Sequence, residues 1–149
     1  MHPSQDDLIS ITQNILSTMI SMEASPMGGK ADPVAGKRLT GCISISGEWK
    51  GAVVIQSSEA FTRQAVCNML QMKPTEVSDS DLEDVLSEIT NMIGGNIKSL
   101  VKSPSFLSLP SVTVGSDFSF QLKGSRVLAE TSLDCNGEQL DVLVCESVT

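Results

Sequence analysis

The sequence predicts an α+β fold, in which an antiparallel sheet carries its helices on one face. Apolar residues recur at helical spacing in three segments and alternate with a period of two in the segments between and after them. Turn-forming residues separate the alternating segments, which is typical of hairpin strands. The expected order is helix, two strands, two helices and then three or four strands. With 149 residues, the chain is expected to form a single domain over 1–149.

The first helix is expected to begin at Ser4, because Ser4 and Asp7 have the spacing of a capping box. An apolar stripe then runs at helical spacing from Leu8 to Met22. The stretch 24–36 breaks the pattern with two prolines and three glycines. It is therefore predicted to be a flexible loop.

A β-hairpin is predicted over 39–55, where β-branched residues alternate on both sides of a turn at Gly47 and Glu48. Ser57 or Ser58 can cap the second helix, which is expected to end before Pro74.

The third helix has the strongest pattern in the chain. Ser80 and Glu83 have capping-box spacing, and a wide apolar face follows over 82–100. The helix is expected to end near Lys102, because the following Ser103-Pro104 opposes helical backbone.

The last third of the chain alternates again, which predicts strands over 112–114, 118–122 and 127–133. Asn136-Gly137 is the pair typical of a type I′ hairpin turn, and a final strand over 140–144 follows it.

Composition excludes several classes of function. The chain has 10 Lys and Arg against 18 Asp and Glu, a net charge of −8, and only 3% aromatic residues. A nucleic-acid interface needs positive charge and usually aromatic platforms, and an anionic membrane also requires positive charge. No apolar run is long enough to span a bilayer and the first ten residues do not resemble a secretion signal, so a cytoplasmic protein is expected.

Common catalytic and metal-binding motifs are also missing. The one histidine, His2, is too near the end of the chain to serve a catalytic triad. No cysteine has the arginine of a cysteine phosphatase six residues later, and Gly36-Lys37-Arg38 fails as a phosphate-binding loop. The four cysteines lack zinc spacing and are expected to be small buried thiols. No metal or other cofactor is therefore expected to bind this chain.

One face of the third helix carries a polar row. At about 100° per residue, five residues fall within an arc of roughly 80°. They are Asp84, Glu88, Asn91, Gly95 and Lys98. An ordinary solvated face is the simplest interpretation of such a row.

Two features favour a functional role for the row. Gly94-Gly95 lies within the helix, where each glycine costs roughly 1 kcal/mol relative to alanine, so close approach by another backbone is expected. Asn91 is a poor helix former, but its carboxamide can both donate and accept hydrogen bonds and can therefore orient a water.

The pattern Asp84-x3-Glu88-x2-Asn91, followed by Leu-Pro-Ser-Val-Thr-Val-Gly over 109–115, resembles the signature of the CheC/CheX family. Members of that family are chemotaxis phosphatases that dephosphorylate the response regulator CheY. The hairpin segment 41–51 is similar to the family's hairpin, so the resemblance covers nearly the whole chain. Pro110 follows Asn91 sooner than in the family pattern, which predicts a shortened connection.

CheC-type members carry the acid–asparagine motif on two helices. Here Ile11 stands at the glutamate position before Asn14, and Ala65 stands at that position before Asn68. A single copy implies the CheX-like branch, and the resemblance then implies a homodimer. Exposed hairpin strands could pair across its subunits.

The resemblance implies a phosphatase that hydrolyses the aspartyl phosphate of a CheY-type response regulator in chemotaxis or a related two-component pathway. Asn91 would hold a water in line with the phosphorus, and Glu88 would pair with the regulator's active-site lysine. Asp84, Gly95 and Lys98 would support or dock, and Mg²⁺ would be held by the regulator and not by this chain.

Two other functions stay open from the sequence. The same fold could be a non-catalytic module that binds response regulators, as in flagellar switch proteins. It could also be a ligand-binding or scaffold domain in which the helix row is merely solvated.

Overall fold

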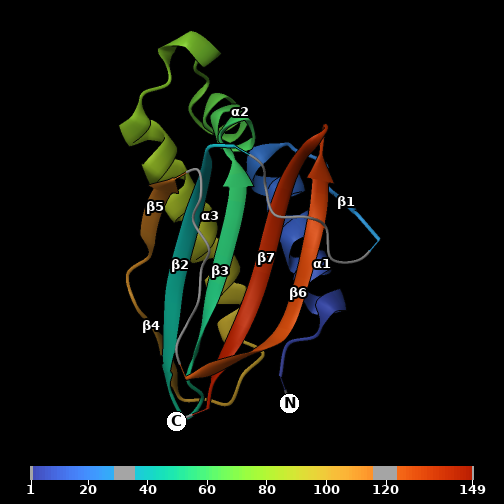
Figure 1. The fold of residues 1–149 in the computed structure, drawn as a ribbon, viewed down its shortest axis with the longest axis vertical. Coiled ribbons are helices and arrows are strands. Elements are labelled where there is room, and N and C mark those ends of the chain that lie inside the picture. The colour runs from blue at the N-terminus through green and yellow to red at the C-terminus, as the bar shows by residue number, and fades with distance from the viewer. Residues whose placement is uncertain (1, 29–35, 116–123, 149) are drawn as a thin grey trace.

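The computed structural model describes residues 2–28, 36–115 and 124–148. One antiparallel sheet packs against helices that lie behind it in Figure 1, as the sequence predicts. The helical elements are α1 (Gln5–Ile15), the π-helical turn η1 (Leu16–Ile20), α2 (Glu59–Leu70), the 3₁₀ turn η2 (Pro74–Glu76) and α3 (Asp79–Lys98). The strands are β1 (Ser25–Pro26), β2 (Arg38–Gly47), β3 (Gly51–Ser58), β4 (Ser105–Leu107), β5 (Ser111–Gly115), β6 (Ser125–Cys135) and β7 (Glu138–Ser147). The strand predicted over 118–122 lies outside the described residues.

The sheet order is β1-β6-β7-β3-β2, and both β4 and β5 pair with the other edge of β2. The β2–β3 hairpin is therefore in the middle of the sheet, where it cannot pair with a second subunit. Asn136 and Gly137, at φ 54° and 86°, form the tight turn predicted between β6 and β7.

The core lies between the sheet and the helices. Leu39, Ile43 and Ile45 of β2 are buried, whereas Ser44 and Ser46 between and after them are exposed. This alternation places the odd-numbered side chains of β2 on the helix side of the sheet. The helix α3 contributes six buried apolar residues to the same core: Leu82, Val85, Leu86, Ile89, Ile93 and Ile97.

The first two helices begin where the sequence predicts. The Asp7 N–H donates to Ser4 Oγ at 3.1 Å, and the Ser4 N–H donates to Asp7 Oδ2 at 2.9 Å, which completes the capping box. Ser58 caps α2 by accepting from the Phe61 N–H at 3.1 Å. Ser57, the other candidate, is buried and bonds to Thr62.

Two short strands were not predicted. Within the predicted loop 24–36, Ser25 and Pro26 pair with Asp134 and Leu133 of β6, while residues 29–35 lie outside the described part. The strand β4 lies in the connection between α3 and β5, and its Leu107 pairs with Ile45. Strands of two and three residues form only by pairing with a neighbouring strand, so no local sequence pattern predicts them.

Both predicted ends of α3 are wrong by a few residues. Ser78, with extended backbone at φ −91° and ψ 167°, is the N-cap, and Asp81 completes the capping box in place of Ser80 and Glu83. Both pairs have the same spacing, so the sequence pattern does not separate them. The helix ends at Lys98, because the Val101 N–H turns back to the Lys98 carbonyl at 3.3 Å in a tighter last turn.

The position of this cap gives a direct test. Ser78→Ala removes the acceptor for the Asp81 N–H and is expected to lower the free energy of unfolding by about 1 kcal/mol. Ser80→Ala is the matched control, because Ser80 is exposed within the first turn and should change stability by less than about 0.5 kcal/mol. Urea unfolding measures both, and a larger loss for Ser80→Ala would contradict this assignment.

No helix among the described residues combines the length and apolar character needed to cross a membrane.

Candidate functional site

The helix α3 lies directly on β2 because glycines remove side chains at the contact. A Cβ on Gly94 would lie 2.7 Å from Ile43 Cγ2, which is closer than real Cβ contacts allow. A Cβ on Gly41 would collide with the Thr90 hydroxyl, which is buried and donates to the Leu86 carbonyl at 2.7 Å. These two contacts fix the height and the rotation of α3 over the sheet.

The structure places the polar row of α3 on the outer side of the helix. Asp84, Glu88 and Asn91 are exposed, and Gly95 and Lys98 are half-buried. Across residues 2–28, 36–115 and 124–148, no hydrogen bond or ion pair engages the four side chains of this row. All five predicted residues thus share one accessible face.

Glu88 and Asn91 are three residues apart, so their side chains are neighbours on the helix surface. The carboxylate of Glu88 can accept hydrogen bonds from an ammonium group, and the carboxamide of Asn91 can both donate to and accept from a water. An exposed pair of this kind can enter the active site of another protein, because no second element of the described fold covers it.

The glycine pair has a different explanation from the one expected. Gly94 is required by the side chain of Ile43 and not by a second backbone. Gly95 has no such requirement, since its nearest neighbour would be Leu107 Cδ1 at 3.9 Å. Because Gly95 has no side chain, nothing projects from the helix surface beside Asn91 at this position. Packing does not require glycine here.

The asparagines on the other two helices do not repeat the site. Asn68 is half-buried, and its amide donates to the Ile20 carbonyl at 2.9 Å and accepts from Gln64 at 2.8 Å. Asn14 is exposed, but the apolar Ile11 precedes it at the acid position.

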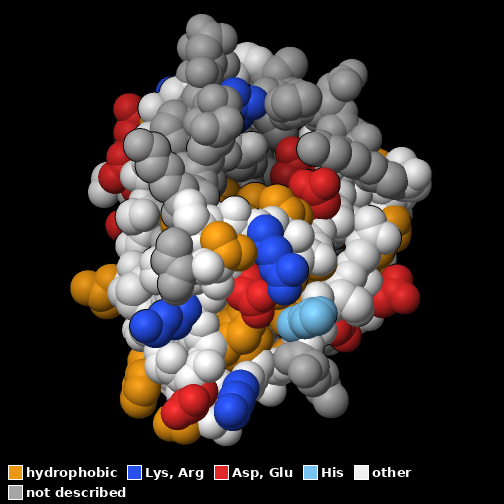
Figure 2. All heavy atoms as spheres, turned by 60° about the horizontal axis from the view of Figure 1, so that its bottom comes forward, with side chains coloured by type: hydrophobic (Ala, Val, Ile, Leu, Met, Phe, Trp, Pro, Cys, Tyr) orange, Lys and Arg blue, Asp and Glu red, His pale blue; other side chains and the backbone are white. Residues whose placement is uncertain are grey.

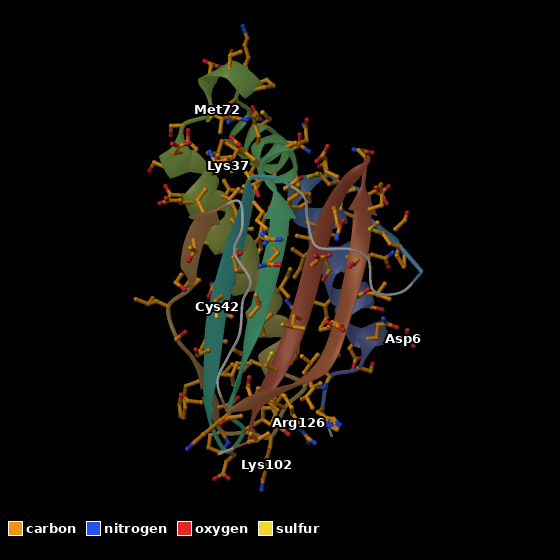
Figure 3. All side chains as sticks on the ribbon, viewed as in Figure 1. Asp6, Lys37, Cys42, Met72, Lys102 and Arg126 are labelled. Atoms are coloured by element: carbon orange, nitrogen blue, oxygen red, sulfur yellow. The ribbon has the colours of Figure 1, made fainter. Side chains whose placement is uncertain are left out.

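The cysteines are free and only partly fit the expectation of four buried thiols. Cys135 and Cys145 are buried, whereas Cys42 and Cys67 are half-buried. Burial raises the pKa of Cys135 to about 12, and burial is also the main reason why the pKa values of Cys42 and Cys145 are raised. Cys42 lies on β2 (Figure 3) and is not part of the α3 row. Thiols with raised pKa are poor nucleophiles near neutral pH.

Two carboxylates with lowered pKa have structural partners. The pKa of Glu59 is lowered chiefly by its hydrogen bond from Arg63, one turn along α2 at 2.8 Å. The pKa of Glu146 is lowered by hydrogen bonds from Arg126 at 2.9 Å and from Trp49 at 2.8 Å. Glu146 thereby links β6, β7 and the β2–β3 turn. Its partner Arg126 lies at the lower end of the molecule in Figure 3, and Figure 2, which brings this end forward, shows acidic and basic side chains close together there. No group of three or more potential metal ligands occurs among the described residues.

Comparison with known families identifies the class of protein. The family of the chemotaxis phosphatase CheX matches residues 39–132, more than half of the chain. This stretch includes the β2–β3 hairpin and the whole of α3 with its row. The chain therefore belongs to the CheX family of chemotaxis phosphatases.

Solved structures with the same fold support this assignment. The chemotaxis protein CheX of Vibrio vulnificus is 21% identical, with 95% of each chain covered and a TM-score of 0.80. CheX of Desulfovibrio desulfuricans is 23% identical, covering 94% of this chain and 96% of that one, with a TM-score of 0.75. CheX in the CheX–CheY–BeF3–Mg complex of Borrelia burgdorferi is 14% identical, with 99% of each chain covered and a TM-score of 0.76. At these identities the likeness concerns the fold. No curated protein matches the chain in sequence.

The residues that pack α3 against the sheet around the site could not be predicted from the sequence. Thr90 is a polar residue that is fully buried in α3, and nothing local marks its contact with Gly41. The only sequence signal was the presence of glycine at 41 and at 94, each in an element that otherwise disfavours it.

Proposed function

We propose that this chain accelerates hydrolysis of the aspartyl phosphate on a CheY-type response regulator. The observation that carries the proposal is the exposed Glu88–Asn91 pair on α3, within the segment that matches the CheX family. The Borrelia burgdorferi complex, in which a protein of this fold is bound to CheY with BeF3 and Mg²⁺, supports the choice of partner.

The proposed reaction needs little from this chain. A water attacks the phosphorus, the bond between phosphorus and the aspartate oxygen of the regulator breaks, and the products are a free carboxylate and inorganic phosphate. The proton lost by the water leaves with the phosphate or with solvent. Because such phosphoryl transfer depends mostly on position and electrostatics, one amide that orients the water can provide much of the acceleration.

Asn91 is proposed to be that amide. Its carbonyl oxygen can accept a hydrogen bond from the water while its NH₂ group donates to a phosphoryl oxygen, and it does both without adding negative charge beside the phosphate. The neighbouring half-buried Gly95 has no side chain that would hold the regulator away from Asn91.

Glu88 is proposed to pair with the active-site lysine of the receiver. The family resemblance implies this pairing. A carboxylate one turn from Asn91 would fix the register of docking, because a displaced complex would leave that charge without its partner. Asp84 and Lys98, at the two ends of the polar row, are proposed to extend the surface that docks the receiver.

Mg²⁺ is proposed to be held by the regulator, where it neutralises charge that develops on the phosphoryl group. The single-site branch that the chain resembles also predicts a homodimer, and this stays a prediction.

The experiment is a decay assay. CheY-type receivers from the source organism are phosphorylated with acetyl phosphate and freed from the donor, and release of inorganic phosphate is followed with and without the chain. Acceleration at catalytic amounts of the chain supports the proposal. Binding of the phosphorylated receiver without acceleration would instead favour the non-catalytic interaction module.

A further inference from the structure

The buried face of α3 contains one residue that an apolar core does not need. In this helix, all of which the structure describes, Thr90 is the one buried residue with a polar side chain. Its hydroxyl donates to the Leu86 carbonyl, one turn earlier, at 2.7 Å. Threonine also has a lower helix propensity than alanine, so it is a locally unfavourable choice at this position.

The strand that faces Thr90 has a locally unfavourable residue at the same point. Gly41 is buried inside β2, where a glycine weakens the strand because it has no side chain to pack. Gly41 pairs with Ile55 of β3 and with Val112 of β5, so β2 is held from both sides here. A Cβ at residue 41 would collide with the Thr90 hydroxyl, which occupies that space instead. We refer to this packing as the Thr90–Gly41 contact.

The Thr90–Gly41 contact lies between the two principal groups of the candidate site. Thr90 directly precedes Asn91 and follows Glu88 by two residues. The turns on either side are fixed, because Leu86 and Ile93 are fully buried. A change at Thr90 therefore cannot be relieved by a shift of the whole helix, and α3 is expected to deform locally, between Glu88 and Asn91.

A small deformation at this point is enough to matter. Serine and threonine that donate to the carbonyl four residues earlier often bend a helix, so the Thr90 hydroxyl influences the local course of α3. Side chains end about 5–6 Å from the helix axis, so a local rotation of about 10° moves the end of a side chain by about 1 Å. A misplacement of about 1 Å can slow a reaction by about 100-fold.

We propose that Thr90 is a positioning residue of the phosphatase. Its hydroxyl, bonded to Leu86 and packed on Gly41, sets the direction of the Asn91 amide relative to the Glu88 carboxylate. This inference rests on the proposed function, because it concerns the same reaction at the same pair. Two residues that each lower local stability meet beneath this pair, which is typical of functional sites, where geometry is maintained although stability is lost.

The test is a double variant that stays folded without the hydroxyl. In Gly41→Ala/Thr90→Ala the new methyl group on β2 occupies the space of the lost hydroxyl, and it would lie 3.3 Å from the Cβ of residue 90. Alanine is favoured over glycine in a strand and over threonine in a helix, so the urea midpoint should be at least that of the unmodified chain. The maximal rate in the decay assay is expected to fall at least about tenfold, with the half-saturating receiver concentration within about threefold.

Thr90→Ser is the conservative control, because it keeps the hydroxyl and its bond but loses a buried methyl group. It is expected to lower the urea midpoint and to keep the maximal rate within about threefold of the unmodified chain. Thr90→Val keeps the shape of the side chain without the donor, and it is expected to be as slow as the double variant. Stability and rate should thus change independently in this set.

Two results would overturn the proposal. One is a maximal rate within about twofold of the unmodified chain for both Thr90→Val and Gly41→Ala/Thr90→Ala. The other is an equal loss of rate in Thr90→Ser and Thr90→Val. Either result would make the Thr90–Gly41 contact a packing contact only.

A measurement without the reaction separates this inference from the proposed function. Nuclear Overhauser contacts between the Asn91 side-chain amide protons and the Glu88 side chain report the relative direction of the two groups in the free chain. They are expected to change in Thr90→Val and to persist in Thr90→Ser. If the unmodified chain does not accelerate phosphate release, the proposed function is wrong. The positioning of Asn91 by Thr90 is then supported by this pattern of contacts and overturned by unchanged contacts in Thr90→Val.

Discussion

Replacing Asn91 with alanine is expected to reduce the acceleration of phosphate release by about 100-fold or more, while binding of the phosphorylated receiver persists. Removal of one preorganised hydrogen-bonding group from a transition state typically costs on the order of 10²–10³ in rate. Asn91 is exposed and its side chain makes no hydrogen bond with the described residues, so alanine should not disturb the helix. Alanine is also a better helix former than asparagine, so a loss of activity in this variant should not result from unfolding.

Asn96→Ala is the matched control. Asn96 is also exposed on α3, but its amide donates back to the Met92 carbonyl at 2.9 Å and it lies roughly a third of a turn or more around the helix from Asn91. The maximal rate at saturating receiver and the affinity for the beryllofluoride-loaded receiver are measured for both variants. Full activity of Asn91→Ala would remove Asn91 from the proposed mechanism.

The second large effect is expected in stability, at Gly94. Gly94→Ala places a methyl group 2.7 Å from Ile43 Cγ2 between α3 and β2. Ile43 is 1% exposed and β-branched, so it has little freedom to move. We expect the free energy of unfolding to fall by about 1–3 kcal/mol, as for other overpacked cores.

Gly95→Ala, at the next residue, is expected to have the opposite sign. Its Cβ would meet only Leu107 Cδ1, at an ordinary 3.9 Å, so the gain in helix propensity should raise the free energy of unfolding by about 0.5–1 kcal/mol. Urea unfolding of the two variants is the measurement. Equal changes for both would mean that α3 does not rest on Ile43 as described.

Local sequence patterns predicted much of the fold. The apolar stripes, the caps at Ser4 and Ser58 and the Asn136-Gly137 turn depend on neighbours in the sequence, and the structure confirms them. The start of α3 was wrong because Ser78 and Ser80 each have an acid three residues later. β1 and β4 were missed because each exists only through pairing with a distant strand.

The candidate site was also predictable from the sequence only in part. The row from Asp84 to Lys98 follows from helix periodicity alone, so its shared exposed face could be predicted. The packing of Gly94 on Ile43 depends on how β2 and the strands β4 and β5 that pair with it align under α3. That alignment is tertiary and leaves no local pattern.

The close seating of α3 on β2 also affects when conformational freedom is lost. The backbone that carries Asn91 is immobilised as the chain folds, because Thr90 and Gly94 on either side of it pack tightly against Gly41 and Ile43 of β2. Only the side-chain rotamer of Asn91 is left to be ordered at each encounter with a receiver, at a cost of about 0.5–1.5 kcal/mol. A phosphatase of this design would therefore approach its substrate as a nearly rigid body, and its turnover would depend on how fast the receiver arrives and departs rather than on rearrangement of its own fold.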